Sequence, residues 1–97
     1  MITIKLKNDT ITISGHAGFS NLGEDIVCAS VSSIINTTVN SIKAIDENAI
    51  DYIDDGNTLT IKRVSSDNIT QTLLNVMISI LHDLSNQYPK NVELKEE

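Results

Sequence analysis

The residues best suited to chemistry in this sequence are a histidine and the chain's single cysteine, His16 and Cys28, which lie twelve positions apart. A cysteine sulfur attacks a carbonyl carbon as the thiolate, and an imidazole within hydrogen-bond reach can take the thiol proton and later return it to the leaving group. The pair therefore has the residue types of a cysteine-dependent acyl-transfer enzyme. The spacing permits the two side chains to meet but does not require it.

The predicted surroundings of the cysteine favour such chemistry. Apolar residues recur with a helical period from Asp25 to about Ile45, so we predict a long helix whose first turn contains Cys28. The positive end of a helix dipole stabilises a thiolate, and the unpaired N–H groups of a first turn could bind the oxyanion of a tetrahedral intermediate. Ser32 follows one turn later on the same face, where its hydroxyl could bond near the thiol or back to the helix backbone.

Each of these residues also has a purely structural interpretation. A free cysteine is commonly a core residue, and Cys28 borders an apolar stripe that includes Val31. A loop histidine such as His16 is more often a surface residue than a catalyst. Asp25 suits the N-cap of the predicted helix, and a carboxylate there would oppose thiolate formation unless it orients His16. Residue types alone leave these alternatives open.

The elements that must position these residues follow the order ββαββαβ. Alternating residues predict a β-hairpin in the first thirteen positions, and Gly15, Gly18 and Gly23 punctuate a loop from Ser14 to Glu24, of a length that is often functional. Strands at 49–53 and 58–64 flank a turn at 54–57, and a weak fifth strand follows at 91–95. We therefore predict a single domain over residues 1–97 of the α+β class, with a four- to five-stranded mixed sheet packed against two long helices.

The second of these helices runs from about Asp67 to Gln87, where Pro89 ends it. His82 falls on its opposite, exposed face, and we assign it no role. The predicted inner face consists of apolar residues at helical spacing, namely Ile69, Leu73, Val76, Met77, Ile80, Leu81 and Leu84.

Composition narrows the function classes. The formal net charge is −6, from seven Lys and Arg against thirteen Asp and Glu, and no basic cluster offers a footprint for a phosphate backbone, so we expect no direct nucleic-acid binding. One cysteine excludes an internal disulfide and a multi-cysteine metal site, and we expect no metal or other cofactor. No apolar run approaches a membrane span, and we expect a reducing, cytoplasmic location.

The segment that holds both candidate residues resembles the ribosomal-processing cysteine protease family, Prp. The family pattern is a Gly-His-Ala triplet, a short loop to a glycine, a helix that starts around Asp-Ile-Val-Cys-Ala, and a nearby serine. Ser30 stands where family members often carry Ala or Gly. The resemblance covers the whole chain and is carried by Gly15-His16-Ala17, Gly23, Asp25-Ile26-Val27-Cys28-Ala29 and Ser32.

This resemblance implies a cytoplasmic bacterial endopeptidase that removes a short N-terminal extension from a large-subunit ribosomal protein, after a Phe in a hydrophobic motif. It implies that Cys28 is the nucleophile and His16 the base, and it leaves the role of Asp25 open. It also implies a homodimer with a mobile loop over the site, residues 17–24, which includes Ala17, Gly18, Phe19 and Gly23. The alternative is a non-catalytic accessory protein of ribosome assembly that binds a peptide tail without cutting it.

Overall fold

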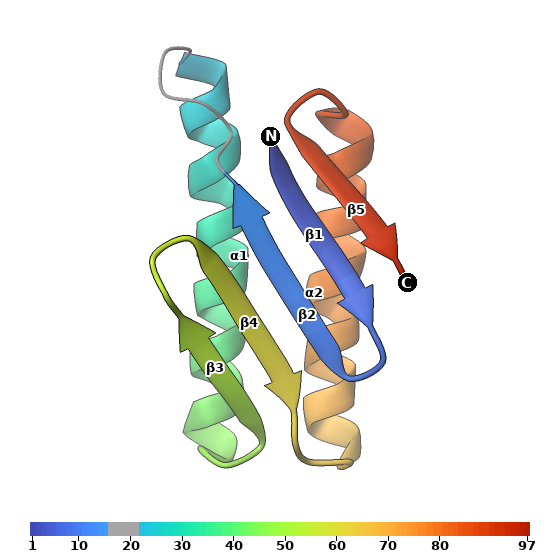
Figure 1. Ribbon diagram of the computed structural model, residues 1–97. Helices are drawn as coiled ribbons and strands as arrows, with labels where there is room; N and C mark the ends of the chain where they lie inside the picture. The colour runs from blue at the N-terminus through green and yellow to red at the C-terminus, as the bar shows by residue number, and fades with distance from the viewer. Residues whose placement is uncertain (16–21) are drawn as a thin grey trace.

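The computed structural model describes residues 1–15 and 22–97, without the side chains of residues 22–25. The predicted ββαββαβ order is confirmed, including the fifth strand (Figure 1). The elements are β1 (Ile2–Lys7), β2 (Thr10–Gly15), α1 (Leu22–Ile45), β3 (Ile50–Asp54), β4 (Thr58–Arg63), α2 (Asn68–Gln87) and β5 (Val92–Glu96).

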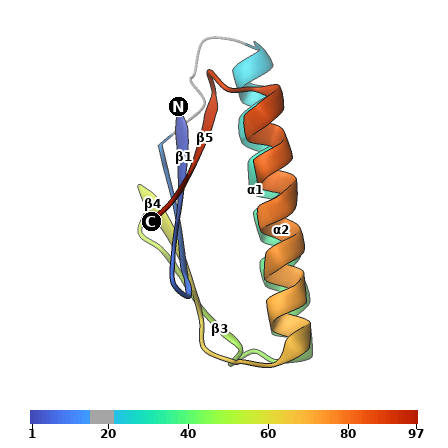
Figure 2. The ribbon, with the colours of Figure 1, turned by 90° about the vertical axis from the view of Figure 1, so that its right-hand side faces the viewer.

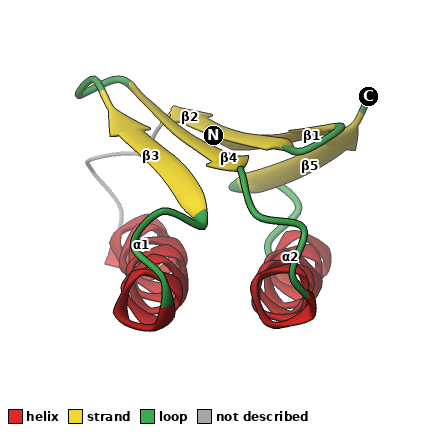
Figure 3. Cartoon of the chain, turned by 90° about the horizontal axis from the view of Figure 1, so that it is seen from below, coloured by secondary structure: helices red, strands yellow, loops and turns green. Residues whose placement is uncertain are grey.

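The five strands form one mixed sheet in the order β3-β4-β2-β1-β5. Neighbouring strands are antiparallel except β1 and β5, which are parallel. Both helices lie side by side on the same face of the sheet, as Figures 2 and 3 show from two directions. The predicted α+β class is therefore confirmed as a two-layer arrangement with its core between the helices and the sheet.

Strand alternation explains which sheet face the helices cover. Ile4 of β1 lies opposite Ile13 of β2, and both are buried, whereas the alternate residues of these strands are polar and more exposed. The hairpin turns through Asn8, whose φ of 53° is a left-handed conformation that Asn tolerates in tight hairpin turns. Because a shift of one residue would turn the isoleucines to solvent, burial fixes this register.

Helix α1 begins three residues earlier than predicted. Gly23 and Glu24, which we placed in a loop, lie in its first turn, and Asp25 is a helical residue and not the N-cap. Leu22 and Glu24 are good helix formers, and acidic residues in a first turn complement the helix dipole, so one glycine is not enough to end the helix. As a result Cys28 lies in the second turn of α1, and the prediction of a first-turn position is wrong.

The inner face predicted for α2 is only partly right. Met77 and Leu81 are buried, but Ile69, Val76 and Ile80 are 55%, 51% and 42% exposed. The buried stripe instead includes Thr70 and Leu74. The sequence has apolar residues on two adjoining faces of this helix, and periodicity alone cannot decide which face meets the sheet. His82 is exposed, as predicted.

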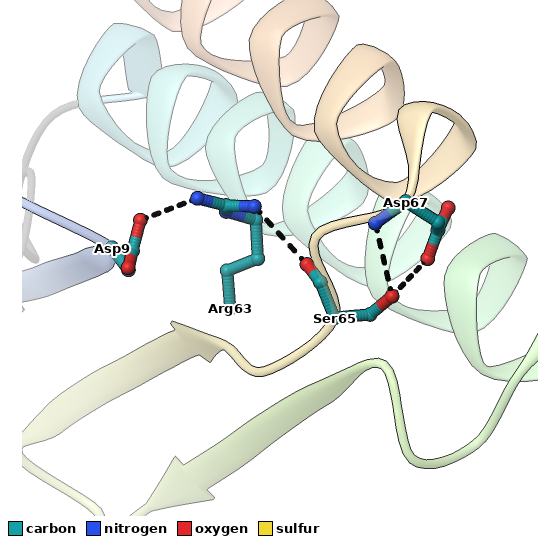
Figure 4. Close-up of polar contacts among 4 residues, drawn as sticks. All are labelled: Asp9, Arg63, Ser65 and Asp67. Atoms are coloured by element: carbon teal, nitrogen blue, oxygen red, sulfur yellow. Dashed lines mark hydrogen bonds and ion pairs between the residues drawn. The ribbon is translucent and has the colours of Figure 1, made fainter.

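The start of α2 is fixed by its N-cap, Asp67 (Figure 4). Its carboxylate accepts hydrogen bonds from the Thr70 backbone N–H at 2.8 Å, from the Thr70 hydroxyl at 2.9 Å, and from the Ser65 hydroxyl. Arg63 donates to the Ser65 carbonyl at 3.1 Å and pairs with Asp9 of the β1–β2 turn at 2.7 Å. Through these contacts of Arg63, the segment between β4 and α2 is connected to the β1–β2 hairpin.

The hydrogen bonds to Asp67, first from Ser65 and then from Thr70, lower the pKa of its carboxyl to about 2. Since the folded-state pKa lies below the ordinary value, the stabilisation is fully present above about pH 4 and is lost as the pH falls toward 2. We expect Asp67→Ala to lower the melting temperature at pH 7 by about 5 °C. The difference from the wild type should shrink between pH 4 and pH 2 in thermal unfolding followed by circular dichroism.

Asp83→Ala, an exposed change within α2, is the matched control and should leave the melting temperature unchanged. An Asp67→Ala deficit that stays constant down to pH 2 would contradict this role for the cap.

Candidate active site

Cys28 lies on the wall of a pocket of about 290 Å³ between α1 and the helix-facing side of the sheet. Cys28 is half-buried and packs against the edge of the core. Helix α1 contributes Cys28, Ser32 and Asn36, which follow one another at intervals of four residues and so form one row along the helix. The structural alternative, in which Cys28 is a fully buried core residue, is therefore excluded, because Cys28 is half-buried and lines a pocket.

The opposite wall of the pocket comes from the second hairpin. Tyr52 and Asp54 of β3 and residues 56–59, at the turn and the start of β4, line it. Burial raises the pKa of Tyr52, and the nearby Asp54 carboxylate raises it further. Lys43 of α1 lies over the Tyr52 ring, 5.6 Å from its centroid. The wall is thus partly aromatic and partly acidic.

The end of β2 forms another part of the pocket wall. Gly15 lines the pocket and pairs with Ile2 of β1. Its φ is +84°, and a Cβ at this position would lie 2.2 Å from the carbonyl oxygen of Met1. Only glycine fits there, and His16 is the next residue in the sequence.

Several predicted site residues lie outside the described part of the chain. These are His16, Ala17, Gly18 and Phe19, together with the side chain of Asp25. Gly23 belongs to the first turn of α1. The pairing of His16 with Cys28 therefore stays a prediction.

Ser32 lies on the pocket wall one turn beyond Cys28, and it is exposed. Its hydroxyl makes no hydrogen bond with any residue that the structure describes, whereas the hydroxyl of Ser30 donates to the Ile26 carbonyl at 2.9 Å. Ser30 is thus the serine whose hydroxyl bonds back to the helix backbone, whereas the Ser32 hydroxyl faces the pocket.

The position of Cys28 in the second turn changes how its sulfur can be activated. Cys28 lies six positions after Leu22, the first residue of α1, and this corresponds to about 9 Å along the helix axis. The field of a helix end falls off within the first turn, and backbone N–H groups at this depth are used inside the helix. Activation by the helix end was predicted for a cysteine in the first turn, and the second-turn position of Cys28 removes that premise.

Tyr52 and Asp54 are site residues that sequence reasoning missed. They lie more than twenty positions from Cys28 and reach its pocket only through the strand order, because Asp54 pairs with Leu59 of β4 and Leu59 pairs with Ile13 of β2. Alternation along β3 does place Tyr52 and Asp54 on one face, but it does not say what that face meets.

Two other features, metal-binding clusters and membrane-spanning helices, concern only the described residues. Within them, no three or more His, Cys, Asp or Glu side chains gather as a metal site would require. None of the described helices is both long and apolar enough to cross a bilayer.

Comparison with known proteins decides the family. A sequence model of the family described as cysteine protease Prp matches residues 1–93. The chain belongs to this family. The ribosomal processing cysteine protease Prp of Staphylococcus aureus is 30% identical to this chain over 103 residues, and the alignment covers 97% of each protein. The Prp protein of Mycoplasma pneumoniae is 31% identical over 99 residues, with 100% of this chain and 96% of the relative covered.

Two crystal structures of the S. aureus Prp protease have the same fold as this chain. One contains a covalently linked product peptide and the other a substrate peptide, and each gives a TM-score of 0.87 over 100% of both chains, with 29% and 28% identity. The resemblance found at the Gly-His-Ala and Asp-Ile-Val-Cys-Ala segments is thereby confirmed. The family to which this chain belongs is a family of cysteine proteases.

Gly15→Ala should destabilise the protein, because the added methyl group would collide with the Met1 carbonyl and the backbone conformation disfavours any side chain. We expect a loss of about 2–4 kcal/mol in the free energy of unfolding, measured by urea denaturation. Gly56→Ala is the matched control, since φ is +91° there but nothing lies within 4 Å of the added carbon. It should lose about 1 kcal/mol. Equal losses in the two variants would contradict the close contact at Gly15.

Proposed function

We propose that this chain is a cysteine endopeptidase that removes a short N-terminal extension from a large-subunit ribosomal protein, after a Phe in a hydrophobic motif. Cys28 is the nucleophile and His16 the general base. The observation that carries the proposal is a half-buried cysteine on the wall of a pocket, in a chain that belongs to a cysteine protease family.

The reaction follows from these two roles. His16 takes the proton of the Cys28 thiol as the sulfur attacks the carbonyl carbon of the Phe, and it returns that proton to the leaving amine of the next residue as the C–N bond breaks. Water then attacks the thioester, with His16 as its base, and releases the extension as a carboxylic acid. We assign Ser32 and Asp25 supporting roles beside the Cys28 and His16 pair, with Ser32 facing the pocket from the next turn of α1. Ala17, Gly18 and Phe19, which precede α1 in the sequence, contact the substrate, as does Gly23 in the first turn of α1.

The shape and chemistry of the pocket support a peptide substrate. Its α1 wall runs from Cys28 to Asn36, about 12 Å, which matches three to four residues of an extended chain. Val31, Ile35 and Leu59 offer apolar contacts for hydrophobic side chains. The related S. aureus protease holds a covalently linked product peptide, which is what attack by a protein nucleophile leaves behind.

The same pocket would also suit an accessory protein of ribosome assembly that binds a peptide tail without cutting it. The cysteine on the wall favours the enzyme, because tail binding gives no reason for a thiol at that point. We further propose a cytoplasmic homodimer that does not bind nucleic acid or membranes directly. The exposed side chains of Ile69, Val76 and Ile80 on the outer face of α2 support self-association, which sedimentation equilibrium would detect as twice the chain mass.

The direct test is cleavage of a peptide with a hydrophobic extension that ends in Phe, followed by mass spectrometry. We expect Cys28→Ala to abolish cleavage and His16→Ala to slow it by about 100- to 10,000-fold, because each removes one partner of the proton transfer. His82→Ala, on the exposed side of α2, is the control and should cleave as fast as the wild type. Cleavage by Cys28→Ala at the wild-type rate would overturn the enzyme assignment. Equal peptide binding by the wild type and Cys28→Ala, without cleavage by either protein, would favour the accessory role.

A further inference from the structure

The pocket beside Cys28 has a single charged wall residue among those that the structure describes, and it is Asp54. The carboxylate comes from the end of β3, opposite α1. Asp54 pairs with Leu59 across the hairpin, and Leu59 pairs in turn with Ile13, and all three line the pocket. The strand register therefore holds the Asp54 side chain on the helix-facing side of the sheet.

The negative charge of Asp54 is not neutralised by a described partner. The ion pairs among the described residues join Arg63 to Asp9 and Lys95 to Glu93. The effect of Asp54 on the pKa of Tyr52 indicates that its charge acts inside the pocket. The rest of the lining is neutral and largely apolar, so the carboxylate is the strongest electrostatic feature that a bound peptide would meet on this wall.

The structural role of Asp54 in the hairpin turn uses only one of its two carboxylate oxygens. One oxygen of Asp54 accepts the Gly56 N–H at 2.9 Å, which closes a local turn. Asp55 already closes the same turn, since its carboxylate accepts the N–H groups of Asn57 at 2.9 Å and Thr58 at 2.7 Å, and Asp55 does not line the pocket. The second oxygen of Asp54 makes no hydrogen bond with a described residue, and it is left to bind a ligand.

We propose that Asp54 makes the protease select peptides with a lysine or arginine within a few residues of the cleaved bond, by pairing with that cation on the hairpin side of the pocket. The inference rests on the proposed function, because it takes the pocket beside Cys28 to be the peptide site. Apolar side chains of the peptide would lie against Val31 and Leu59, and the basic side chain would extend to the carboxylate. Since Asp54 is exposed, the pair should change kcat/KM by about three- to tenfold.

The test compares peptides that differ only in a lysine or a glutamine, placed in turn at three positions on each side of the cleaved bond. The wild type should cut one lysine peptide about three- to tenfold faster than its glutamine partner, and the preference should fade as sodium chloride rises from 50 to 500 mM. Asp54→Asn keeps an oxygen for the Gly56 bond, and the ratio of its rates on the lysine and glutamine peptides should fall to about one. Asp54→Glu should retain part of the preference.

Asp51→Asn is the matched control, because Asp51 belongs to the same strand but points to the opposite face of the sheet. It should keep the full preference. Three results would overturn the role of Asp54 while leaving the cleavage itself established. The lysine preference could survive in Asp54→Asn, or the wild type could show no preference at any position. Alternatively, Asp54→Asn could lose the same fraction of activity on both peptides. Affinities of Cys28→Ala for the same peptides, from fluorescence anisotropy, make the same comparison without cleavage. Failure of the wild type to cut any peptide would instead count against the proposed function.

Discussion

The packing of α1 on the sheet is the constraint on which the site depends. Val27, Val31 and Ile35 form a buried row that meets the strands, and this burial fixes the rotation of the helix about its axis. The adjoining row, one residue further along, consists of Cys28, Ser32 and Asn36 and therefore faces the pocket. A rotation by one residue, about 100°, would bury the sulfur and remove it from the substrate side.

The sheet supplies the other half of the arrangement. Two antiparallel pairings, β2 with β4 and β4 with β3, place the end of β2 and the tip of the β3–β4 hairpin around the same pocket, although they are about forty positions apart in the sequence. Gly15 allows β2 to end against the backbone of Met1, one residue before the candidate base. Because Cys28 lies beyond the reach of the helix end, this account assigns the activation of sulfur to an imidazole and not to the helix dipole.

The sequence was sufficient for the order of elements, because alternation in β1 and β2 and the 3.6-residue period of α1 are strong local signals. It was insufficient wherever the outcome depended on neighbours in space. The start of α1 was misplaced because Gly23 was given more weight than the helix-forming Leu22 and Glu24 beside it. The inner face of α2 was partly wrong because Val76 and Met77 are both apolar and only packing decides between them. Asp54 was missed because its contribution to the pocket exists only once the strand order is known.

The central claim is that His16 activates the sulfur of Cys28 in the folded protein. The most direct measurement is the rate at which iodoacetamide alkylates Cys28 at pH 6.5, followed by intact-protein mass spectrometry in the wild type, His16→Ala and His82→Ala. The account predicts that the His16→Ala thiol reacts at least about tenfold more slowly than the wild type, because the thiolate loses its stabilising partner, while His82→Ala matches the wild type. Equal rates in the wild type and His16→Ala would contradict it.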